Sequence, residues 1–247
     1  MTANSFRADL FAGHVALVCG GTSGIGAAIG SALAGLGAAV TVSGATPAEA
    51  DAARERAGFA GSAIALDVRD GEGVEACMQR FSRLDILVNC AGVIRRGAEH
   101  DPKIFAEVID INLTGTMRLC AASRPLLTRS HGCIVNMASM YSFFGGAHAP
   151  GYTASKGGIA QLTKALAVAY AADKIRVNAI APGWIATPLT RIVRDDPQKS
   201  GAILGRTPIG RWGEPDDVAA ATVFLCSPAA AFVTGVILPV DGGYLIA

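Results

Sequence analysis

VALVCGGTSGIGAAIGSALAGLG, residues 15–37, contains a short apolar run, a glycine-rich turn and an apolar pattern of helical spacing. Residues 15–18 are all apolar, which is typical of a strand buried on both faces. Ile25, Ile29, Leu33 and Leu36 then recur at intervals of three and four residues, as on one face of a helix. The stretch therefore predicts a strand, a tight turn and a helix, and every later segment can be placed relative to it.

The turn carries Gly20, Gly24 and Gly26 in the spacing G-x-x-x-G-x-G. Glycine has no Cβ, so the backbone can approach a phosphate closely, and the helix that follows offers unpaired N–H groups and a positive dipole end. These features predict a site for the diphosphate of a dinucleotide. A plain loop is the alternative in a chain with 30 glycines among 247 residues, but the flanking strand and helix favour the binding site.

The composition limits the classes of protein to consider. A chain of 247 residues with 51% hydrophobic content can bury one large core, so we expect a single domain over 1–247. The net charge of +1 lacks the basic footprint of a nucleic-acid partner. Residues 1–11 lack the apolar centre of a signal peptide and no apolar run reaches membrane-spanning length, so no membrane partner is expected. Six scattered cysteines without a Cys-x-x-Cys pair predict a reduced, cytoplasmic protein with no metal site.

Strand-like and helix-like segments alternate along the chain. The expected strands are residues 15–18, 39–43, 62–66, 85–88, 133–137, 176–180 and 236–239. After the first helix, the expected helices are residues 47–57, 74–81, 102–111, 113–128, 152–172 and 216–226, with an irregular segment at 188–204. Alternation of this kind implies parallel strands with right-handed crossovers. We therefore expect an α/β fold, a Rossmann-type doubly wound parallel sheet of about seven strands with helices on both faces.

Several polar or small residues come just after expected strands. Ligands of a doubly wound sheet bind beyond the carboxyl ends of its strands. The residues at these ends are Asp67, Asn89, Ala91, Gly92, Ser139 and Pro182. We expect them to share one rim of the sheet with the glycine turn.

Tyr152 and Lys156 are four residues apart on an expected helix and therefore share a face. A lysine ammonium favours the phenolate, which predicts that the pKa of Tyr152 falls from about 10 towards the range of a general acid or base. Tyr170 and Lys174 have the same spacing, but they come just before an expected strand and so belong to the opposite rim. Tyr152, Lys156 and Ser139 are the catalytic candidates.

Six motifs follow one another along the chain: CGGTSGIG, NCAG, INLTG, NMASM, YTASK and IAPGWIAT. Together they resemble the short-chain dehydrogenase/reductase family in its single-domain form, over residues 15–243. The resemblance implies that Tyr152 donates or accepts a proton, that Lys156 lowers its pKa and holds the nicotinamide ribose, and that Ser139 positions the substrate oxygen. Asn112 would hold a water between Lys156 and solvent. The reaction would be hydride transfer between a nicotinamide and a carbinol carbon, interconverting a secondary alcohol and a ketone.

The resemblance also implies cofactor contacts. Asp67 and Val68 would contact the adenine, Asn89 the ribose region, and Ile185 and Thr187 the nicotinamide carboxamide. The full expected set is Gly20, Thr22, Ser23, Gly24, Ile25, Gly26, Gly44, Asp67, Val68, Asn89, Ala91, Gly92, Tyr152, Lys156, Pro182, Gly183, Ile185 and Thr187. The family usually has threonine at position 19 and asparagine at position 90, where this chain has cysteines. We expect these two departures to affect local stability more than activity.

The choice between NAD and NADP depends on the residues after the second strand. An acidic residue there selects NAD, and NADP requires a cation for its phosphate. Gly44 and Ala45 occupy these positions and carry neither preference. Ser23 stands where NADP-preferring relatives often have a basic residue, and no Arg or Lys follows before Arg54. We therefore expect NAD rather than NADP.

The strings AGVIRRG, NMASMYSFFGG and GRWGEP most resemble the sugar-acid branch of the family, which includes 2-deoxy-gluconate 3-dehydrogenases and gluconate 5-dehydrogenases. A small carboxylate-bearing polyol agrees with arginines around the expected cleft, although surface positions would also explain them. These arginines are Arg95, Arg96, Arg191, Arg194, Arg206 and Arg211. The expected substrate wall comprises Arg95, Tyr141, Phe144, His148 and Trp184.

Two other functions stay open. An aromatic wall also suits a reductase of hydrophobic ketones or 3-oxoacyl thioesters, in which Arg95, Arg96 and Arg129 would meet an anionic carrier or coenzyme A. A nucleotide-binding regulator without catalysis is disfavoured, because Ser139, Tyr152 and Lys156 are all intact.

Assembly is inferred from the same resemblance. The helix after Tyr152 is rich in glycine and alanine, and relatives pair through such helices and commonly form homotetramers. Residues 188–213 form a long segment beside the cofactor rim and are the expected substrate lid.

Overall fold

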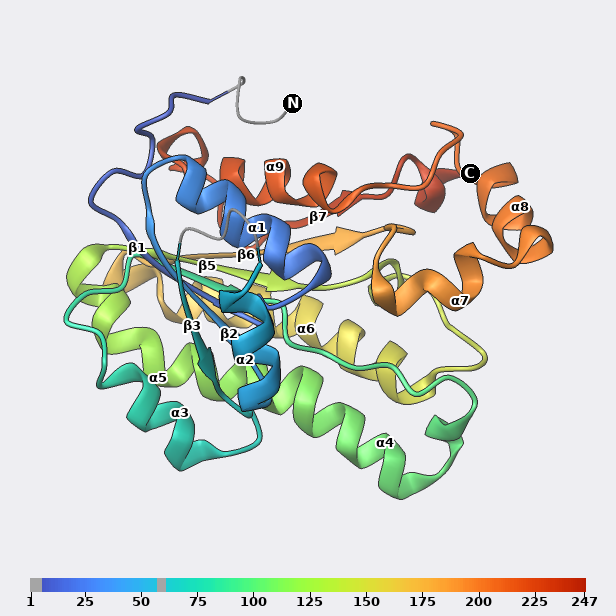
Figure 1. The fold of residues 1–247 in the computed structure, drawn as a ribbon, viewed down its shortest axis with the longest axis horizontal. Helices are drawn as coiled ribbons and strands as arrows, with labels where there is room; N and C mark the ends of the chain where they lie inside the picture. The colour runs from blue at the N-terminus through green and yellow to red at the C-terminus, as the bar shows by residue number, and fades with distance from the viewer. Residues whose placement is uncertain (1–5, 57–60) are drawn as a thin grey trace.

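The computed structural model describes residues 6–56 and 61–247, which form one parallel sheet with helices on both faces (Figure 1). The strands are β1 (Val15–Cys19), β2 (Ala39–Gly44), β3 (Ser62–Ala65), β4 (Ile86–Asn89), β5 (Cys133–Met137), β6 (Arg176–Pro182) and β7 (Ile237–Val240). Their order is β3-β2-β1-β4-β5-β6-β7, and every neighbouring pair is parallel. The order reverses between β1 and β4, which confirms the prediction of a doubly wound sheet and places the ligand-binding crevice there.

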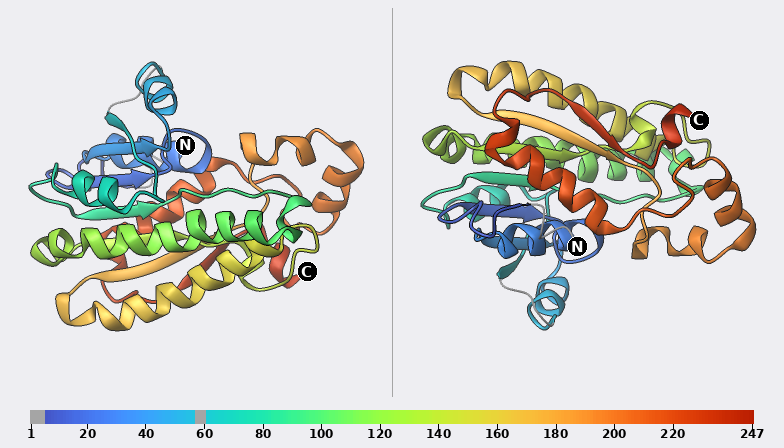
Figure 2. Two further views of the ribbon diagram at one scale, coloured as in Figure 1. Left: turned by 90° about the horizontal axis from the view of Figure 1, so that it is seen from below. Right: turned by 90° about the horizontal axis from the view of Figure 1, so that it is seen from above.

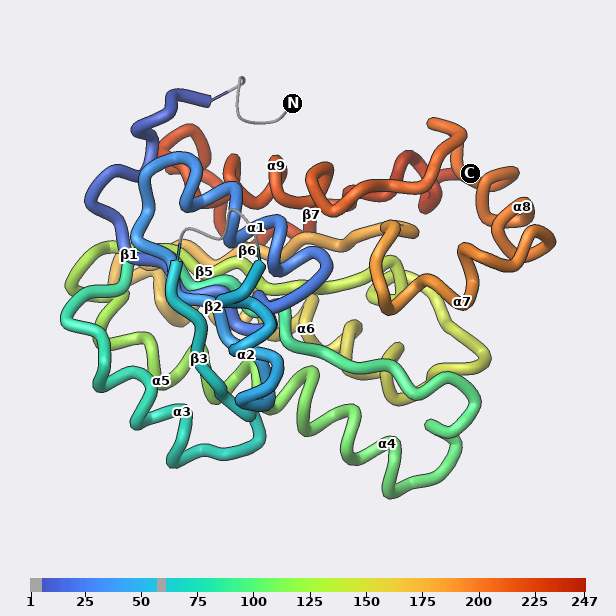
Figure 3. The backbone as a smooth tube through the Cα atoms, in the orientation of Figure 1, coloured from blue at the N-terminus to red at the C-terminus, as the bar shows by residue number. Residues whose placement is uncertain are grey.

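The helices form the two outer layers. They are α1 (Gly24–Gly35), α2 (Pro47–Arg54), α3 (Gly71–Met78), α4 (Pro102–Ile109), α5 (Gly115–Ser130), α6 (Pro150–Ala169), α7 (Arg191–Arg194), α8 (Pro197–Gly205) and α9 (Pro215–Cys226). Figure 2 shows α1 and α9 side by side over one face of the sheet, and α4, α5 and α6 over the other. In Figure 3 the chain after β6 continues into α7 and α8, beyond the end of the sheet at which β6 terminates.

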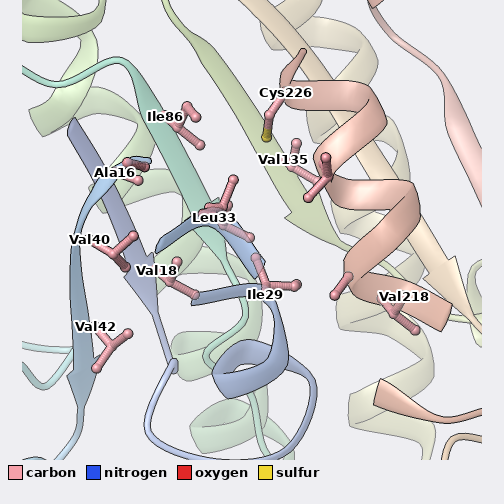
Figure 4. Close-up of a cluster of buried hydrophobic side chains, with 14 of the residues drawn as sticks. Ala16, Val18, Ile29, Leu33, Val40, Val42, Ile86, Val135, Val218 and Cys226 are labelled. Carbon is pink, nitrogen blue, oxygen red and sulfur yellow. The ribbon is translucent and has the colours of Figure 1, made fainter. Parts of the chain in front are cut away.

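Side chains of β1 alternate between two buried clusters. Ala16 and Val18 pack with α1 and α9, together with Ile29, Leu33 and Val218 (Figure 4). Leu17 and Cys19 point to the other face and pack against residues of α3, α5 and α6. Because both faces of the strand are covered, almost every residue of β1 is apolar, as the run at residues 15–18 predicts.

Several boundaries differ from those expected. The two helices expected at 102–111 and 113–128 are one continuous rod, since a π-helical turn, Asp110–Thr114, joins α4 to α5. The segment expected to be irregular, 188–204, contains α7 and most of α8. The helix expected at 47–57 ends at Arg54, with residue 57 outside the described residues, as are the first five residues of the N-terminal segment. Nowhere in 6–56 and 61–247 is there a helix whose length and apolarity would suit a membrane crossing.

Candidate active site

A cleft of about 880 Å³ opens at the carboxyl ends of the strands. Most of the expected site residues line it. They are Gly20, Thr22, Ser23, Gly24, Ile25, Gly26, Gly44, Asp67, Val68, Ala91, Gly92, Arg95, Ser139, Tyr152, Lys156, Pro182, Gly183, Ile185 and Thr187. Six expected residues lie outside the lining: Asn89, Asn112, Tyr141, Phe144, His148 and Trp184.

The glycine turn between β1 and α1 forms a backbone cradle that no other residue type would fit. Gly20 has φ +74°, and a Cβ there would lie 2.5 Å from the Ala91 nitrogen. A Cβ on Gly26 would lie 2.2 Å from the carbonyl oxygen of Gly20. The first turn of α1 has no acidic side chain, so its N–H groups and dipole face the cleft uncompensated. These residues fit the diphosphate of a dinucleotide. The nicotinamide of such a cofactor would supply or accept the hydride.

Ser139, Tyr152 and Lys156 converge from two elements. Ser139 follows β5 and accepts a hydrogen bond from the Tyr141 N–H (3.2 Å), which begins a 3₁₀ turn. Pro150 starts α6, so Tyr152 falls in its first turn and Lys156 one turn later. The Lys156 ammonium lies 5.5 Å from the centre of the Tyr152 ring and donates to the Met137 carbonyl oxygen (2.6 Å). The three side chains therefore share one wall of the cleft, as their spacing predicts.

The electrostatics of this pair differ from the expectation. Burial raises the pKa of Tyr152 above its usual value, because removal of water disfavours the phenolate, although hydrogen bonding with Ser139 and the charge of Arg96 act in the other direction. Burial also lowers the pKa of Lys156 to about 8. The expected lowering of the Tyr152 pKa by Lys156 is therefore wrong for the protein without its cofactor. Desolvation of the phenol itself is the largest cause of the raised pKa of Tyr152.

Asn112 lies in the π-helical turn, a feature often found at functional sites. Its Nδ2 donates to the Val93 carbonyl oxygen (2.9 Å) and to the Ser155 hydroxyl (3.0 Å), and its Oδ1 accepts from the Val93 N–H (2.8 Å). A Cβ on Gly92 would lie 3.3 Å from Asn112 Oδ1 and 3.7 Å from Lys156 Nζ. The Asn112 side chain thus ties the chain after β4 to α6, directly behind the cleft.

Asn89 points away from the cleft. It is 3% exposed, and its Nδ2 donates to Asn136 Oδ1 (2.8 Å) on the neighbouring strand and to Cys120 Sγ (3.3 Å). The side chain is therefore on the α5 side of the sheet. The expected contact of this side chain with the cofactor ribose has no support in this geometry.

The two cysteines that depart from the family, Cys19 and Cys90, both line the cleft. Cys19 also accepts a hydrogen bond from the Ser43 hydroxyl (3.3 Å), which links β1 to β2. Burial raises the pKa of each thiol to about 12, so both are neutral and poorly nucleophilic at neutral pH.

Four of the expected substrate residues lie in the segments that flank Tyr152 or the cleft. Arg95 lines the cleft and pairs with Glu107 (3.3 Å). The Tyr141 ring lies edge-on to the Tyr152 ring, with centroids 5.9 Å apart, and Phe144 packs behind it at 5.4 Å. His148 contributes its carbonyl oxygen to the Gly97 N–H (2.7 Å).

The remaining candidates are engaged elsewhere. Trp184 packs against Trp212, with ring centroids 5.8 Å apart. Arg206 stacks over Tyr244 at 4.4 Å and over Phe144 at 5.5 Å, so it adjoins the ring cluster of Tyr141 and Phe144. Arg211 pairs with Asp217 at 2.7 Å. Tyr170, the tyrosine of the second Tyr-x-x-x-Lys pair, ends α6 beneath Arg124, at the amino-terminal side of the sheet.

Glu49 lines the cleft beyond β2, and the sequence interpretation missed it. It lies in the first turn of α2, and its Oε2 accepts a hydrogen bond from the Ala45 N–H (2.8 Å). The sequence Thr46-Pro47-Ala48-Glu49 could have indicated it, because threonine followed three residues later by glutamate is typical of a capped helix start. The Thr46 hydroxyl does accept from the Glu49 N–H (3.2 Å), which turns the carboxylate back over the end of β2.

The sequence and the fold define the class of protein. A family model described as enoyl-(acyl carrier protein) reductase matches residues 20–245. The chain belongs to the short-chain dehydrogenase/reductase family and is an NAD(P)-dependent oxidoreductase.

Individual relatives share nearly the whole chain. The 2-dehydro-3-deoxy-D-gluconate 5-dehydrogenase of Bacillus subtilis is 42% identical over 241 residues, covering 94% of this chain and 95% of the relative. The cis-4-hydroxycyclohexanecarboxylate dehydrogenase of Sinomonas cyclohexanicum is 43% identical over 247 residues, covering 96% and 98%. The crystal structure of a gluconate 5-dehydrogenase from Burkholderia cenocepacia, in complex with NADP and tartrate, superposes with a TM-score of 0.89 at 34% identity and covers 97% and 98%.

Proposed function

We propose that this protein interconverts a secondary alcohol and a ketone on a small carboxylate-bearing sugar acid or polyol. The observation that carries the proposal is the position of two arginines, one in the lining of the cleft and one near Tyr152. Arg95 lines the cleft, and the charge of Arg96 is close enough to lower the pKa of Tyr152. Guanidinium groups pair with carboxylates through short, charge-assisted hydrogen bonds. The names of all three compared proteins include an acid or its carboxylate, which supports the same substrate class.

The side chains divide the chemistry between them. Ser139 would hold the substrate oxygen beside the Tyr152 hydroxyl, and Tyr152 would accept its proton in oxidation and return it in reduction. Lys156 would hold the nicotinamide ribose and balance charge at the phenol. A nicotinamide held at this site would supply or take up the hydride of the carbinol carbon, so that each direction moves one hydride and one proton.

A panel of substrates tests this function. We expect kcat/KM for a keto-sugar acid to exceed that for acetoacetyl thioesters and for simple cyclic ketones by at least about tenfold, the effect of one ion pair worth about 1.4 kcal/mol. Arg96→Met should remove most of this preference, whereas Arg129→Met should leave it unchanged. Equal activity on the neutral ketone would contradict the proposed substrate class.

The thioester alternative loses part of its support in the structure. Arg129 lies in the last turn of α5, just before β5, and therefore at the amino-terminal ends of the strands. It is thus at the opposite end of the sheet from Arg95, which lines the cleft at the carboxyl ends of the strands.

We propose NAD as the preferred cofactor, because Glu49 places a carboxylate beyond β2. A carboxylate accepts hydrogen bonds from ribose hydroxyls and repels a phosphate on the same ribose. Two observations favour NADP: the Arg56 guanidinium donates to the Thr22 carbonyl oxygen, and the gluconate 5-dehydrogenase from Burkholderia cenocepacia is in complex with NADP.

Glu49→Gln tests the cofactor preference. The amide keeps an oxygen for the Ala45 N–H but removes the charge. We expect the ratio of kcat/KM with NAD to that with NADP to fall about tenfold or more, as a charge-assisted hydrogen bond is worth about 1.5–3 kcal/mol. Asp51→Asn, on the same helix and paired with Arg54, is the matched control and should leave the ratio unchanged. An unchanged ratio in Glu49→Gln would refute the assignment.

We propose one domain over 1–247, in which residues 188–213 act as a lid over the substrate. The two ends of this segment are tied together, because the Ala186 N–H donates to the Gly213 carbonyl oxygen (2.8 Å) and the Gly213 N–H to that of Trp184 (2.9 Å). The lid can then move as a unit about these bonds. Limited proteolysis should cut within the lid in the free enzyme and more slowly with cofactor and substrate bound; equal rates would argue against closure.

We also propose a cytoplasmic homotetramer. Ala154, Ala165 and Ala169 are exposed on α6, and beside them Val168 is 81% exposed. Small residues let a partner helix approach closely, so this face suits a subunit contact. The six cysteines are unpaired, in keeping with a reducing compartment. Light scattering should give four times the mass of one chain.

A further inference from the structure

Glu99, in the segment between β4 and α4, is only 1% exposed, although residues 95–98 before it are exposed. A buried carboxylate is costly unless donors satisfy it. Oε1 of Glu99 accepts a hydrogen bond from the Arg95 N–H (2.6 Å), and Oε2 accepts one from the Tyr152 N–H (2.7 Å). One carboxylate group thus joins the backbone of a cleft arginine to the backbone of the proton carrier.

The second of these bonds compensates for a missing cap. Helix α6 begins after Ala149, whose methyl side chain cannot accept a hydrogen bond, and its first residue is Pro150. Tyr152 is therefore among the first-turn residues whose N–H groups have no partner within the helix. Glu99, 53 residues away in sequence, supplies that partner and places a negative charge at the positive end of the helix dipole.

Neighbouring contacts hold the same two segments together. The Gly97 N–H donates to the His148 carbonyl oxygen (2.7 Å), and the His100 ring lies 3.2 Å from the Ala147 carbonyl oxygen. Gly97 has φ +79°, which lets the chain turn and bury Glu99. The segment 95–100 is thus docked on the start of α6 at three points, with Glu99 at the buried one.

We propose that Glu99 is a positioning residue that sets the distance between the proposed substrate-binding arginines, Arg95 and Arg96, and the Tyr152 hydroxyl. A carboxylate with both oxygens engaged is rigid, so the two backbone segments cannot shift independently. A displacement of about 1 Å at a reacting group can cost about a hundredfold in rate. Glu99 therefore makes the anion-binding end and the proton-transfer end of the cleft a single unit.

The negative charge of Glu99 also affects the pKa of the Tyr152 phenol. Among the groups that face Tyr152, hydrogen bonding with Ser139 and the charge of Arg96 lower its pKa, whereas Tyr141 and Glu99 raise it; the Lys156 ammonium lies 5.5 Å from the ring. Removing the negative charge of Glu99 therefore lowers the pKa of Tyr152. Alcohol oxidation needs the phenolate, so the acid limb of its pH profile moves to lower pH.

Glu99→Gln tests the proposal, which rests on the proposed role of Tyr152. The amide keeps one acceptor oxygen and turns an NH₂ group towards the other N–H, so one of the two bonds is lost. We expect kcat to fall about tenfold or more, KM for the anionic substrate to rise, KM for the cofactor to stay constant, and the acid limb to move to lower pH. Glu99→Asp retains the charge and should leave the limb in place.

Asp101→Ala is the matched control, because Asp101 caps α4 through the Lys103 N–H (2.7 Å) and touches neither Arg95 nor Tyr152. It should lower Tm without changing KM or the pH limb. If Glu99→Gln, like this control, lowers Tm but leaves the kcat of the folded enzyme, the substrate KM and the acid limb unchanged, Glu99 is only a structural cap and the proposal is overturned. If Tyr152→Phe keeps normal turnover, the proposed proton carrier fails instead, and the rise in substrate KM still decides the role of Glu99.

Discussion

Replacing Tyr152 by Phe is expected to lower kcat at least about a hundredfold, the usual contribution of a positioned general acid or base. The phenyl ring keeps the edge-on packing against Tyr141 and leaves the backbone bond to Glu99 in place, so the fold and the cofactor site persist. Only the group that carries the proton is removed. Steady-state kinetics in both directions, with cofactor affinity measured by fluorescence titration, would separate loss of chemistry from loss of binding.

Tyr170→Phe is the matched control for this substitution. Tyr170 has a lysine at the same spacing but ends α6 on the far side of the sheet, where it is 4% exposed beneath Arg124. Loss of its hydroxyl should leave kcat within about twofold of the parent value, because no reacting group is within reach. Near-normal turnover in Tyr152→Phe would remove the proton carrier from the proposed mechanism.

Replacing Gly20 by Ala is expected to lower cofactor affinity by at least about tenfold and to reduce Tm. The residue has φ +74°, a conformation that costs an L-residue roughly 1–2 kcal/mol. In addition, the new Cβ would lie 2.5 Å from the Ala91 nitrogen and 2.7 Å from its Cα, so the backbone after β4 must move. Both effects open the cradle in which the diphosphate would lie.

Gly35→Ala, at the far end of the helix that follows the turn, provides the comparison. Gly35 is the last residue of α1, its φ is not in the left-handed region, and among the described residues a Cβ built there meets nothing within 4 Å beyond its own turn of helix. This variant should keep the cofactor affinity and gain up to about 1 kcal/mol in unfolding free energy. Titration and thermal denaturation of both variants measure the contrast. Equal affinities would show that the turn does not form the cofactor site.

The parts of the fold that the sequence predicts are those carried by local patterns. The run at 15–18 and the turn at Gly20 specify a buried strand and a helix start within a few residues of one another. Tyr152 and Lys156 share a helix face because of helical geometry alone, and the structure places both in the cleft. Tyr170 and Lys174 have the same spacing, and their place just before β6 is what separates them from this pair.

Asn89 shows where a local rule needs the sheet around it. Its place after an apolar run put it on the correct rim, but side chains alternate along a strand, and Asn89 shares the face of Leu87. That face packs against α5, so the amide meets Cys120 and Asn136 instead of the cleft. Which face of a central strand meets which helix is decided only when the layers pack.

By itself the sequence determined the order of strands and helices, the glycine turn and the helical pairing of Tyr152 with Lys156, because each depends on residues close together in the chain. Tertiary structure alone decided the raised pKa of Tyr152, since that shift follows from the water excluded by packing. It also decided the positions of Glu49 in the lining of the cleft and of Glu99 against the backbone of Tyr152. Glu99 acts on Tyr152 across 53 residues, and no periodic pattern records a contact of that range.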